Sequence, residues 1–139
     1  MKTVRVKVNE SKGRVLNWLV AKVEGAKGVR LHTYRTLEPV PPVWVVDWER
    51  DWTELSSLDY CNDGSMSYDI IEREGIGFFC NRTAADGARF KPDAGGDWRA
   101  FSKNKMGEHF FGPTSLIAAL RCHVTRKLGE YVEVPEELL

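Results

Sequence analysis

A chain of 139 residues with 42% hydrophobic and 29% charged residues has the size and composition of one globular domain, so we expect residues 1–139 to form a single domain. It is too apolar for a disordered protein, and no apolar run approaches the ~20 residues that a membrane-spanning helix needs. Twenty basic and twenty acidic residues give zero net charge, which argues against a generally basic nucleic-acid-binding protein.

The N-terminus and the cysteines indicate an intracellular protein. The first eight residues alternate charged side chains with valine, whereas a signal peptide needs an unbroken apolar stretch. Cys61, Cys80 and Cys122 are an odd number without paired spacing, which is typical of reduced thiols. We therefore expect a cytoplasmic protein, with no membrane partner.

Charge is distributed unevenly along the chain. Residues 1–35 hold nine Lys/Arg and two Asp/Glu, a charge of +7, whereas residues 36–75 hold two and ten, a charge of −8. Two interpretations are open: the segments neutralise each other across the fold, or a basic and an acidic surface meet separate partners.

Hydrophobic periodicity predicts a strand, a helix and two further strands in the first third of the chain. Valines alternate with charges over residues 3–8, as in a half-buried strand. Ser11 can cap the helix that follows, and Gly25 can end it. Strands are expected at residues 29–34 and 43–46, separated by a proline-rich segment.

The middle of the chain is expected to be less regular. Asp47 is predicted to cap a short helix with Trp48, Trp52 and Leu55 on one face. Residues 59–69 are rich in Asp, Asn, Gly and Ser, a composition that is typical of a loop.

A second short helix and its neighbours follow. Asp69 and Glu72 are spaced as a variant of the capping box, and Gly75 would end this helix. Residues 76–80 are predicted to be a strand, and residues 83–97 an irregular excursion.

The last helix has the clearest signals. Pro113 suits the first turn because it has no amide hydrogen to leave unpaired, and Gly129 suits the end. Short strands are expected at residues 98–101 and 131–134. Together these elements predict an α+β fold, a mostly antiparallel sheet of about four to five short strands packed with an N-terminal and a C-terminal helix.

Two polar groups are candidates for a ligand site. The start of the last helix offers hydroxyls and free amides that could hold an anion, although ordinary capping is the competing interpretation. Carboxylates around Ile70 and Ile71 could perform acid–base chemistry or hold a metal, or could simply cap and solvate a helix. The candidate ligand-binding residues are Gly112, Pro113, Thr114, Ser115, Asp63, Asp69, Glu72 and Glu74.

No motif predicts a catalytic residue, a metal or a cofactor. Cys122 and His123 are neighbours, and neighbours on a helix point about 100° apart. The chain contains no CxxC, HExxH or phosphate-binding glycine loop.

The clustered tryptophans Trp44, Trp48 and Trp52 have two interpretations. They could fill the core of a small domain, or they could line a pocket for planar ligands. If exposed, this acidic segment, residues 38–58, could also be the interface of a homodimer.

Five segments, in order along most of the chain, have a familiar pattern: LNWLVAKVEG (16–25), IIEREGI (70–76), GPTSLIAALRC (112–122), KLGE (127–130) and VEVPEEL (132–138). They resemble the NinX family of tailed-phage and prophage proteins. The C-terminal resemblance is the most specific, and the N-terminal one is looser. The chain departs from the family before the central motif, where the family has an Asp-Trp and a Gly-Gly-Pro step: Asp63 is retained, but Gly64 stands where the tryptophan would be.

The resemblance implies an accessory phage protein in the cytoplasm of a bacterial host cell and supplies no reaction. We expect a non-enzymatic binding module for a small anionic ligand or a host protein. One alternative is a nucleic-acid-associated factor that uses the basic first third of the chain, although no nucleic-acid motif is present. A weaker alternative is an enzyme on a small anionic substrate, with Asp63, Glu72 or Thr114 in its site.

Overall fold

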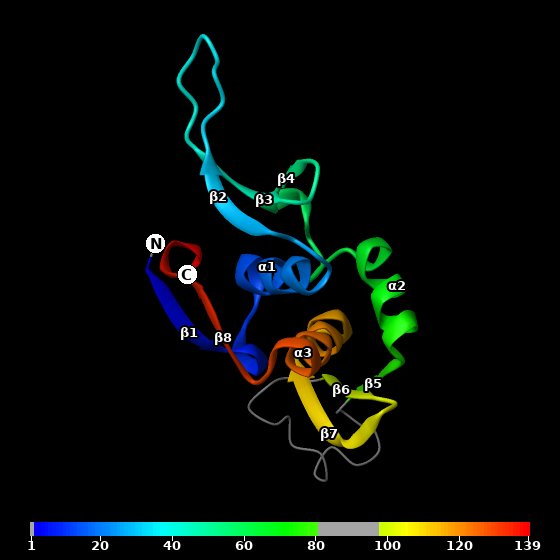
Figure 1. The fold of residues 1–139 in the computed structure, drawn as a ribbon. Coiled ribbons are helices and arrows are strands. Elements are labelled where there is room, and N and C mark those ends of the chain that lie inside the picture. Colours follow the sequence, from blue (N-terminus) through cyan, green and yellow to red (C-terminus); the bar gives the residue numbers. More distant parts are fainter. Residues whose placement is uncertain (1, 81–97) are drawn as a thin grey trace.

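The computed structural model describes residues 2–80 and 98–139 (Figure 1). The expected excursion over residues 83–97 lies outside this part of the chain. The helices are α1 (Gly13–Val23), α2 (Gly64–Glu74) and α3 (Ser115–Leu128), with short 3-10 turns η1 (Val8–Glu10), η2 (Leu55–Ser57) and η3 (Glu136–Leu138). The strands are β1 (Thr3–Lys7), β2 (Gly28–His32), β3 (Val43–Asp47), β4 (Trp52–Glu54), β5 (Ile76–Cys80), β6 (Trp98–Ser102), β7 (Lys105–Gly112) and β8 (Tyr131–Pro135).

The predicted α+β class is confirmed. The eight strands among the described residues are antiparallel and lie in three separate sheets, β1–β8, β2–β3–β4 and β5–β6–β7. The first sheet joins the two ends of the chain, with Val4 opposite Val134 and Val6 opposite Val132. None of the described helices is both long and apolar enough to cross a membrane.

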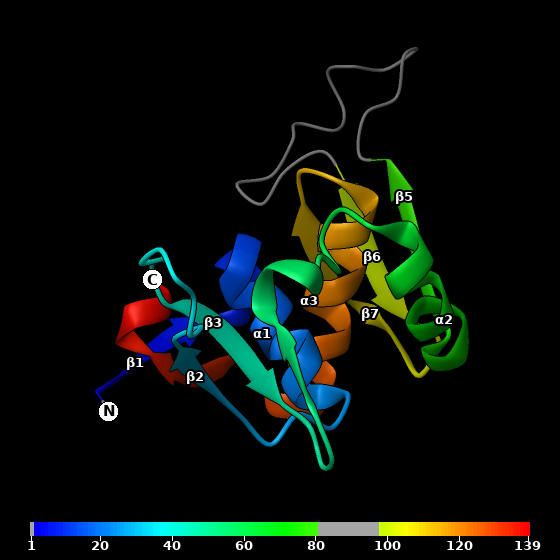
Figure 2. The ribbon, with the colours of Figure 1, turned by 90° about the horizontal axis from the view of Figure 1, so that it is seen from above.

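The helix α3 lies at the centre of the molecule, between α1 and the β5–β6–β7 sheet (Figure 2). Leu19 of α1 and Leu120 and Val124 of α3 are fully buried in one hydrophobic cluster. On its other side α3 presents Ala118 and Ala119 to a second cluster that includes residues of the sheet. Small side chains suit this side because they allow the helix to approach the strands closely.

The predicted end of α3 at Gly129 is confirmed, whereas Pro113, predicted in its first turn, lies just before the N-cap residue. Thr114 is the N-cap residue, and its hydroxyl accepts a hydrogen bond of 3.2 Å from the amide of Ile117. Gly129 follows the last residue with a φ of 100°, which favours glycine. Local chemistry therefore accounts for both ends of this helix.

The prediction of a helix beginning at Asp47 is wrong, because this segment forms the hairpin β3–β4. The Trp48 amide donates a 2.8 Å hydrogen bond to the Asp51 carbonyl, which closes the turn, and Val46 pairs with Thr53. The run of β-branched residues in β3 and the strand pairing outweigh the helical spacing of the tryptophans.

The loop predicted over residues 59–69 is wrong in its second half, because α2 begins at Gly64. Asp63 caps this helix: its Oδ1 accepts bonds of 3.0 Å from the Ser65 amide and 2.6 Å from the Ser65 hydroxyl. Asp69 therefore lies inside the helix instead of capping it. Ser11 does not cap α1 either, since its hydroxyl donates to the carbonyl of Val8 at 2.7 Å.

Candidate functional site

The two candidate groups from the sequence lie at opposite ends of α3. Gly112–Ser115 lead into its first turn, whereas Glu74 meets Lys127 near its last residue, with 3.3 Å between Oε1 and Nζ. A helix of 14 residues is about 20 Å long at ~1.5 Å per residue. The structure therefore does not bring these two groups into one pocket.

The residues at the start of α3 shape its junction with β7. Thr114 caps the helix, and Pro113 is exposed. Gly112 is buried against the helix, so that an added Cβ would lie 2.6 Å from the backbone nitrogen of Ala118. These contacts give Gly112 and Thr114 structural roles, and Ser115 is half-buried beside them.

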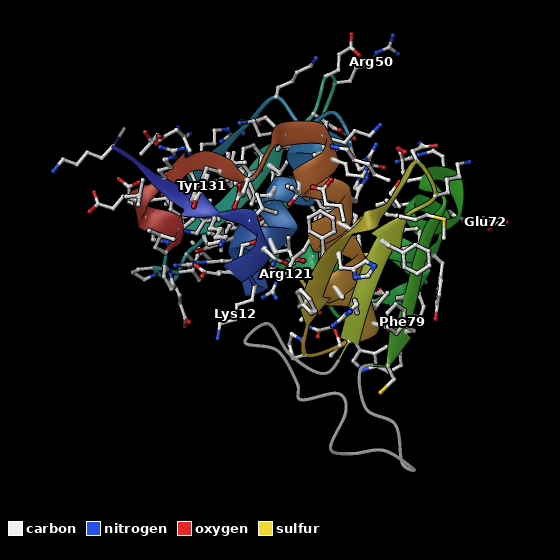
Figure 3. The ribbon with its side chains drawn as sticks, turned by 90° about the horizontal axis from the view of Figure 1, so that it is seen from below. Lys12, Arg50, Glu72, Phe79, Arg121 and Tyr131 are labelled. Atoms are coloured by element: carbon white, nitrogen blue, oxygen red, sulfur yellow. The ribbon has the colours of Figure 1, made fainter. Side chains whose placement is uncertain are left out.

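The four candidate carboxylates have different surroundings. Asp63 is occupied with capping α2, as described above. Asp69 and Glu72 are exposed, and Figure 3 shows Glu72 at the outer edge of the molecule, pointing away from it. Glu74 is half-buried and turned toward α3, which makes it the member of this group that takes part in a pocket.

A cavity of about 70 Å³ lies where α2 ends, β5 begins, the β6–β7 turn passes and the last turns of α3 approach. Its lining residues are Glu74, Ile76, Ser102, Asn104, His123, Arg126 and Lys127. Six of the seven side chains are polar, so the cavity suits a polar occupant.

His123 is the most deeply buried polar side chain of this pocket, at 1% exposure. Its Nε2 lies 3.3 Å from Oε2 of Glu24, and its Nδ1 is buried without a hydrogen-bond partner in the described part of the chain. Burial lowers the pKa of His123, and this outweighs the opposite effect of the Glu24 carboxylate. The imidazole is therefore neutral at pH 7 and donates its Nε2 hydrogen to Glu24.

Two carboxylates beside the pocket are already paired. Arg73 donates to both oxygens of Glu24, at 3.0 and 2.8 Å, and its Nε lies 3.6 Å from Glu74. Burial alone would raise the pKa of Glu74, but the hydrogen bond and the charge of Lys127 bring it below its ordinary value. Each carboxylate is thus paired with a cation, Glu24 with Arg73 and Glu74 with Lys127.

Arg126 supplies a positive charge beyond those pairs. It is exposed and forms no hydrogen bond or ion pair with the described residues. With Arg73 and Lys127 it makes three cations against the two carboxylates Glu24 and Glu74, so the pocket and its rim carry one surplus positive charge.

Neutral donors complete the pocket. The hydroxyl oxygen of Ser102, a residue 3% exposed, accepts a 3.3 Å bond from the Asn104 amide, and its hydrogen has no acceptor among the described residues. The side-chain amide of Asn104 is exposed at the β6–β7 turn. Hydrogen-bond donors together with surplus positive charge favour an anionic group.

Sequence reasoning missed most of this pocket. In the sequence, His123 is notable only as the neighbour of Cys122. Burial raises the pKa of the Cys122 thiol to about 12, so this thiol remains protonated at neutral pH. Arg126 and Lys127 lie in the last turn of α3, where basic residues ordinarily complement the helix dipole, and no local pattern marks Ser102 or Asn104. Across residues 2–80 and 98–139, no three His, Cys, Asp or Glu side chains converge as a metal site would require.

The clustered tryptophans divide between the core and the surface. Trp44 and Trp48 pack against the larger hydrophobic cluster. Trp52 is 40% exposed and stacks on the surface with His32, at 4.8 Å between ring centroids. Two of the three tryptophans, Trp44 and Trp48, therefore fit the interpretation that they fill the core.

Comparison with known proteins gives a family match. A sequence model of the family described as "Bacteriophage P22, NinX" matches residues 7–127, a span that includes every residue lining the pocket. No curated protein matches the chain.

Proposed function

This chain belongs to the phage P22 NinX family, and from that premise we propose that it is a non-enzymatic accessory protein that binds a small anionic group in the pocket beside His123. The observation that carries the proposal is the surplus charge of Arg126 at the rim of a polar cavity. A phosphate or carboxylate group there would pair with the guanidinium and accept hydrogen bonds from Ser102 and Asn104.

The size of the cavity limits what enters it. About 70 Å³ corresponds to roughly two water molecules, at about 30 Å³ each in the liquid. A single phosphate or carboxylate group fits this space, and the rest of a larger ligand would lie outside, over Arg126 and Asn104. The pocket thus recognises an anionic group and leaves the remainder of the ligand in solvent.

The surroundings of the pocket favour binding over catalysis. The Nε2 hydrogen of His123 is directed to Glu24, and its neighbour Cys122 is a buried, protonated thiol. Glu74 is held by Lys127 and has a lowered pKa, so it is a poor general acid at neutral pH. None of these groups is poised to exchange a proton with a bound ligand.

Thermal unfolding in the presence of small anions tests the proposal. Inorganic phosphate and succinate, each at millimolar concentration, are compared with potassium chloride at the same ionic strength. A ligand at 100 times its Kd stabilises the native state by about 2.7 kcal/mol, so a specific anion raises the unfolding temperature more than chloride does.

Two variants locate the effect. Arg126→Gln removes the surplus charge and is expected to abolish the anion-specific shift. Arg50→Gln removes an exposed arginine from the β3–β4 turn, which contributes no residue to the pocket lining, and should leave the shift intact. Equal losses in both variants, or no shift with either anion, would contradict the proposed site and favour a protein partner.

A further inference from the structure

The β5–β6–β7 sheet has one face packed on α3 and the other turned away from it. Side chains alternate along each strand, so Phe78, Ala100 and Phe110 point inward to the core. In Figure 3, which labels Phe79, the outer face is turned to the viewer, and no other described helix or strand crosses it. The outward set consists of Gly77, Phe79, Arg99, Phe101, His109 and Phe111.

The outward rings form one continuous cluster. The centroids of Phe79, Phe101 and His109 lie 6.1, 6.2 and 6.3 Å apart in the three pairs. Arg99, which is paired with Phe79 on one side and Phe111 on the other, holds its guanidinium carbon 5.7 and 4.8 Å from their ring centroids. We call these five side chains the aromatic face.

Part of the aromatic face is exposed to solvent. Phe79 is 40% exposed and His109 is exposed, while Phe101 is half-buried. The Phe101 ring leans across Gly77 on the neighbouring strand, so closely that a Cβ at Gly77 would lie 2.6 Å from the Cζ of Phe101. Glycine thus lets a ring lie against the backbone, which keeps the surface flat.

The charges of this sheet suit a polyanion. Its described residues include the cations Arg99, Lys103 and Lys105 and one carboxylate, Glu108. Lys105 lies 3.3 Å from Glu108, and Lys103 is exposed at the β6–β7 turn. Arg99 places positive charge directly beside the exposed rings. An apolar patch without charge would instead favour binding to another apolar protein surface.

We propose that the aromatic face binds single-stranded nucleic acid, with unpaired bases stacked on Phe79 and Phe101 and the backbone passing beside Arg99. Flat rings accept any base because every base has a π-face, and cationic side chains attract the phosphates. A duplex is a poor ligand because its bases are already stacked. DNA and RNA strands share this chemistry, and the 2′-hydroxyl distinguishes them.

This site is independent of the anion pocket. The aromatic face lies on the side of the sheet away from α3, whereas His123, Arg126 and Lys127 of the pocket belong to α3. Arg126→Gln should therefore leave nucleic-acid binding unchanged, and Phe79→Ala should leave the anion-induced thermal shift unchanged. Failure of one proposal can thus be distinguished from failure of the other.

Fluorescence anisotropy with labelled oligothymidylate, oligouridylate and a duplex of the same length tests the inference. Strands of about 15 nucleotides match the usual range of site sizes. Binding is expected to one or both single strands at low salt, to weaken as salt increases, and to be weaker for the duplex. Phe79→Ala and Phe101→Ala should each reduce the affinity about tenfold or more.

Matched variants separate stacking from loss of structure. Phe79→Trp keeps a ring at the site and should retain the affinity, whereas Phe79→Leu keeps an apolar side chain without a ring and should not. Tyr131→Ala is the control: Tyr131 is 45% exposed and has Arg5 4.5 Å above its ring, but it lies on β8, in another sheet. Each variant is first checked for a cooperative unfolding transition.

Three results would overturn the inference. The first is the absence of binding to both single strands at low salt. The second is equal affinity of Phe79→Ala, Phe101→Ala and Tyr131→Ala for the strand. The third is duplex binding as tight as single-strand binding, because stacked bases cannot reach the rings.

Discussion

His123 of α3 and Glu24 at the end of α1 are joined by a hydrogen bond of 3.3 Å, although 99 residues separate them in the chain. The histidine is almost fully buried and the carboxylate is also held by Arg73. This contact links α1, α2 and α3 beside the anion pocket. The predictions below concern this contact and the packing of α3.

Replacing His123 with glutamine should reduce the loss of stability at mildly acidic pH. Burial places the folded-state pKa of His123 below its unfolded value of about 6.5, so as the pH falls the unfolded chain binds the proton first. The contribution of this residue is therefore present above about pH 6.5 and is lost below it. Chemical denaturation at pH 7.5 and pH 5.5 measures the difference.

The matched control for this experiment is the same substitution at the exposed His109. His109→Gln should retain the pH dependence of the wild-type protein, whereas His123→Gln should flatten it between the two pH values. A wild-type slope that survives in His123→Gln would show that other groups determine the acid sensitivity.

Removing the Glu24 carboxylate should destabilise the protein more than removing a carboxylate at the surface. Glu24→Ala leaves the buried Nε2 hydrogen of His123 without an acceptor, which costs about 1–3 kcal/mol. The exposed Glu72 is the control, and Glu72→Ala is expected to change stability by no more than ~0.5 kcal/mol. Urea unfolding at pH 7.5 gives both values, and equal values would contradict this role of Glu24.

The close approach of β7 to α3 makes Gly112 intolerant of a side chain. Gly112→Ala would place a Cβ 2.6 Å from the backbone nitrogen of Ala118, and a helix backbone can yield only by shifting as a whole. Overpacking of this kind costs about 1–3 kcal/mol.

Gly107 provides the comparison on the same strand. A Cβ there meets no atom within 4 Å, so Gly107→Ala should change the free energy of unfolding by less than ~0.5 kcal/mol. Thermal unfolding of the two variants measures the contrast, and a well-tolerated Gly112→Ala would disprove the tight junction.

The amino-acid sequence by itself determined the elements whose signals are local. Thr114 and Gly129 mark the ends of α3 through their own side-chain and backbone preferences, and the alternation in β1 and β8 marks both strands. The α+β class and the family resemblance also followed from these segments, and the family match over residues 7–127 confirms the resemblance.

Only the tertiary structure decided the elements and contacts that depend on distant partners. Residues 47–55 have helical spacing, yet they form a hairpin because Val46 gains a strand partner in Thr53. Within the candidate site, Glu74 was identified from its position near a predicted helix, whereas its neighbours His123, Arg126 and Ser102 come from elements that no local pattern connects with it. A pocket is a property of side chains brought together by packing, and packing is set by the whole core.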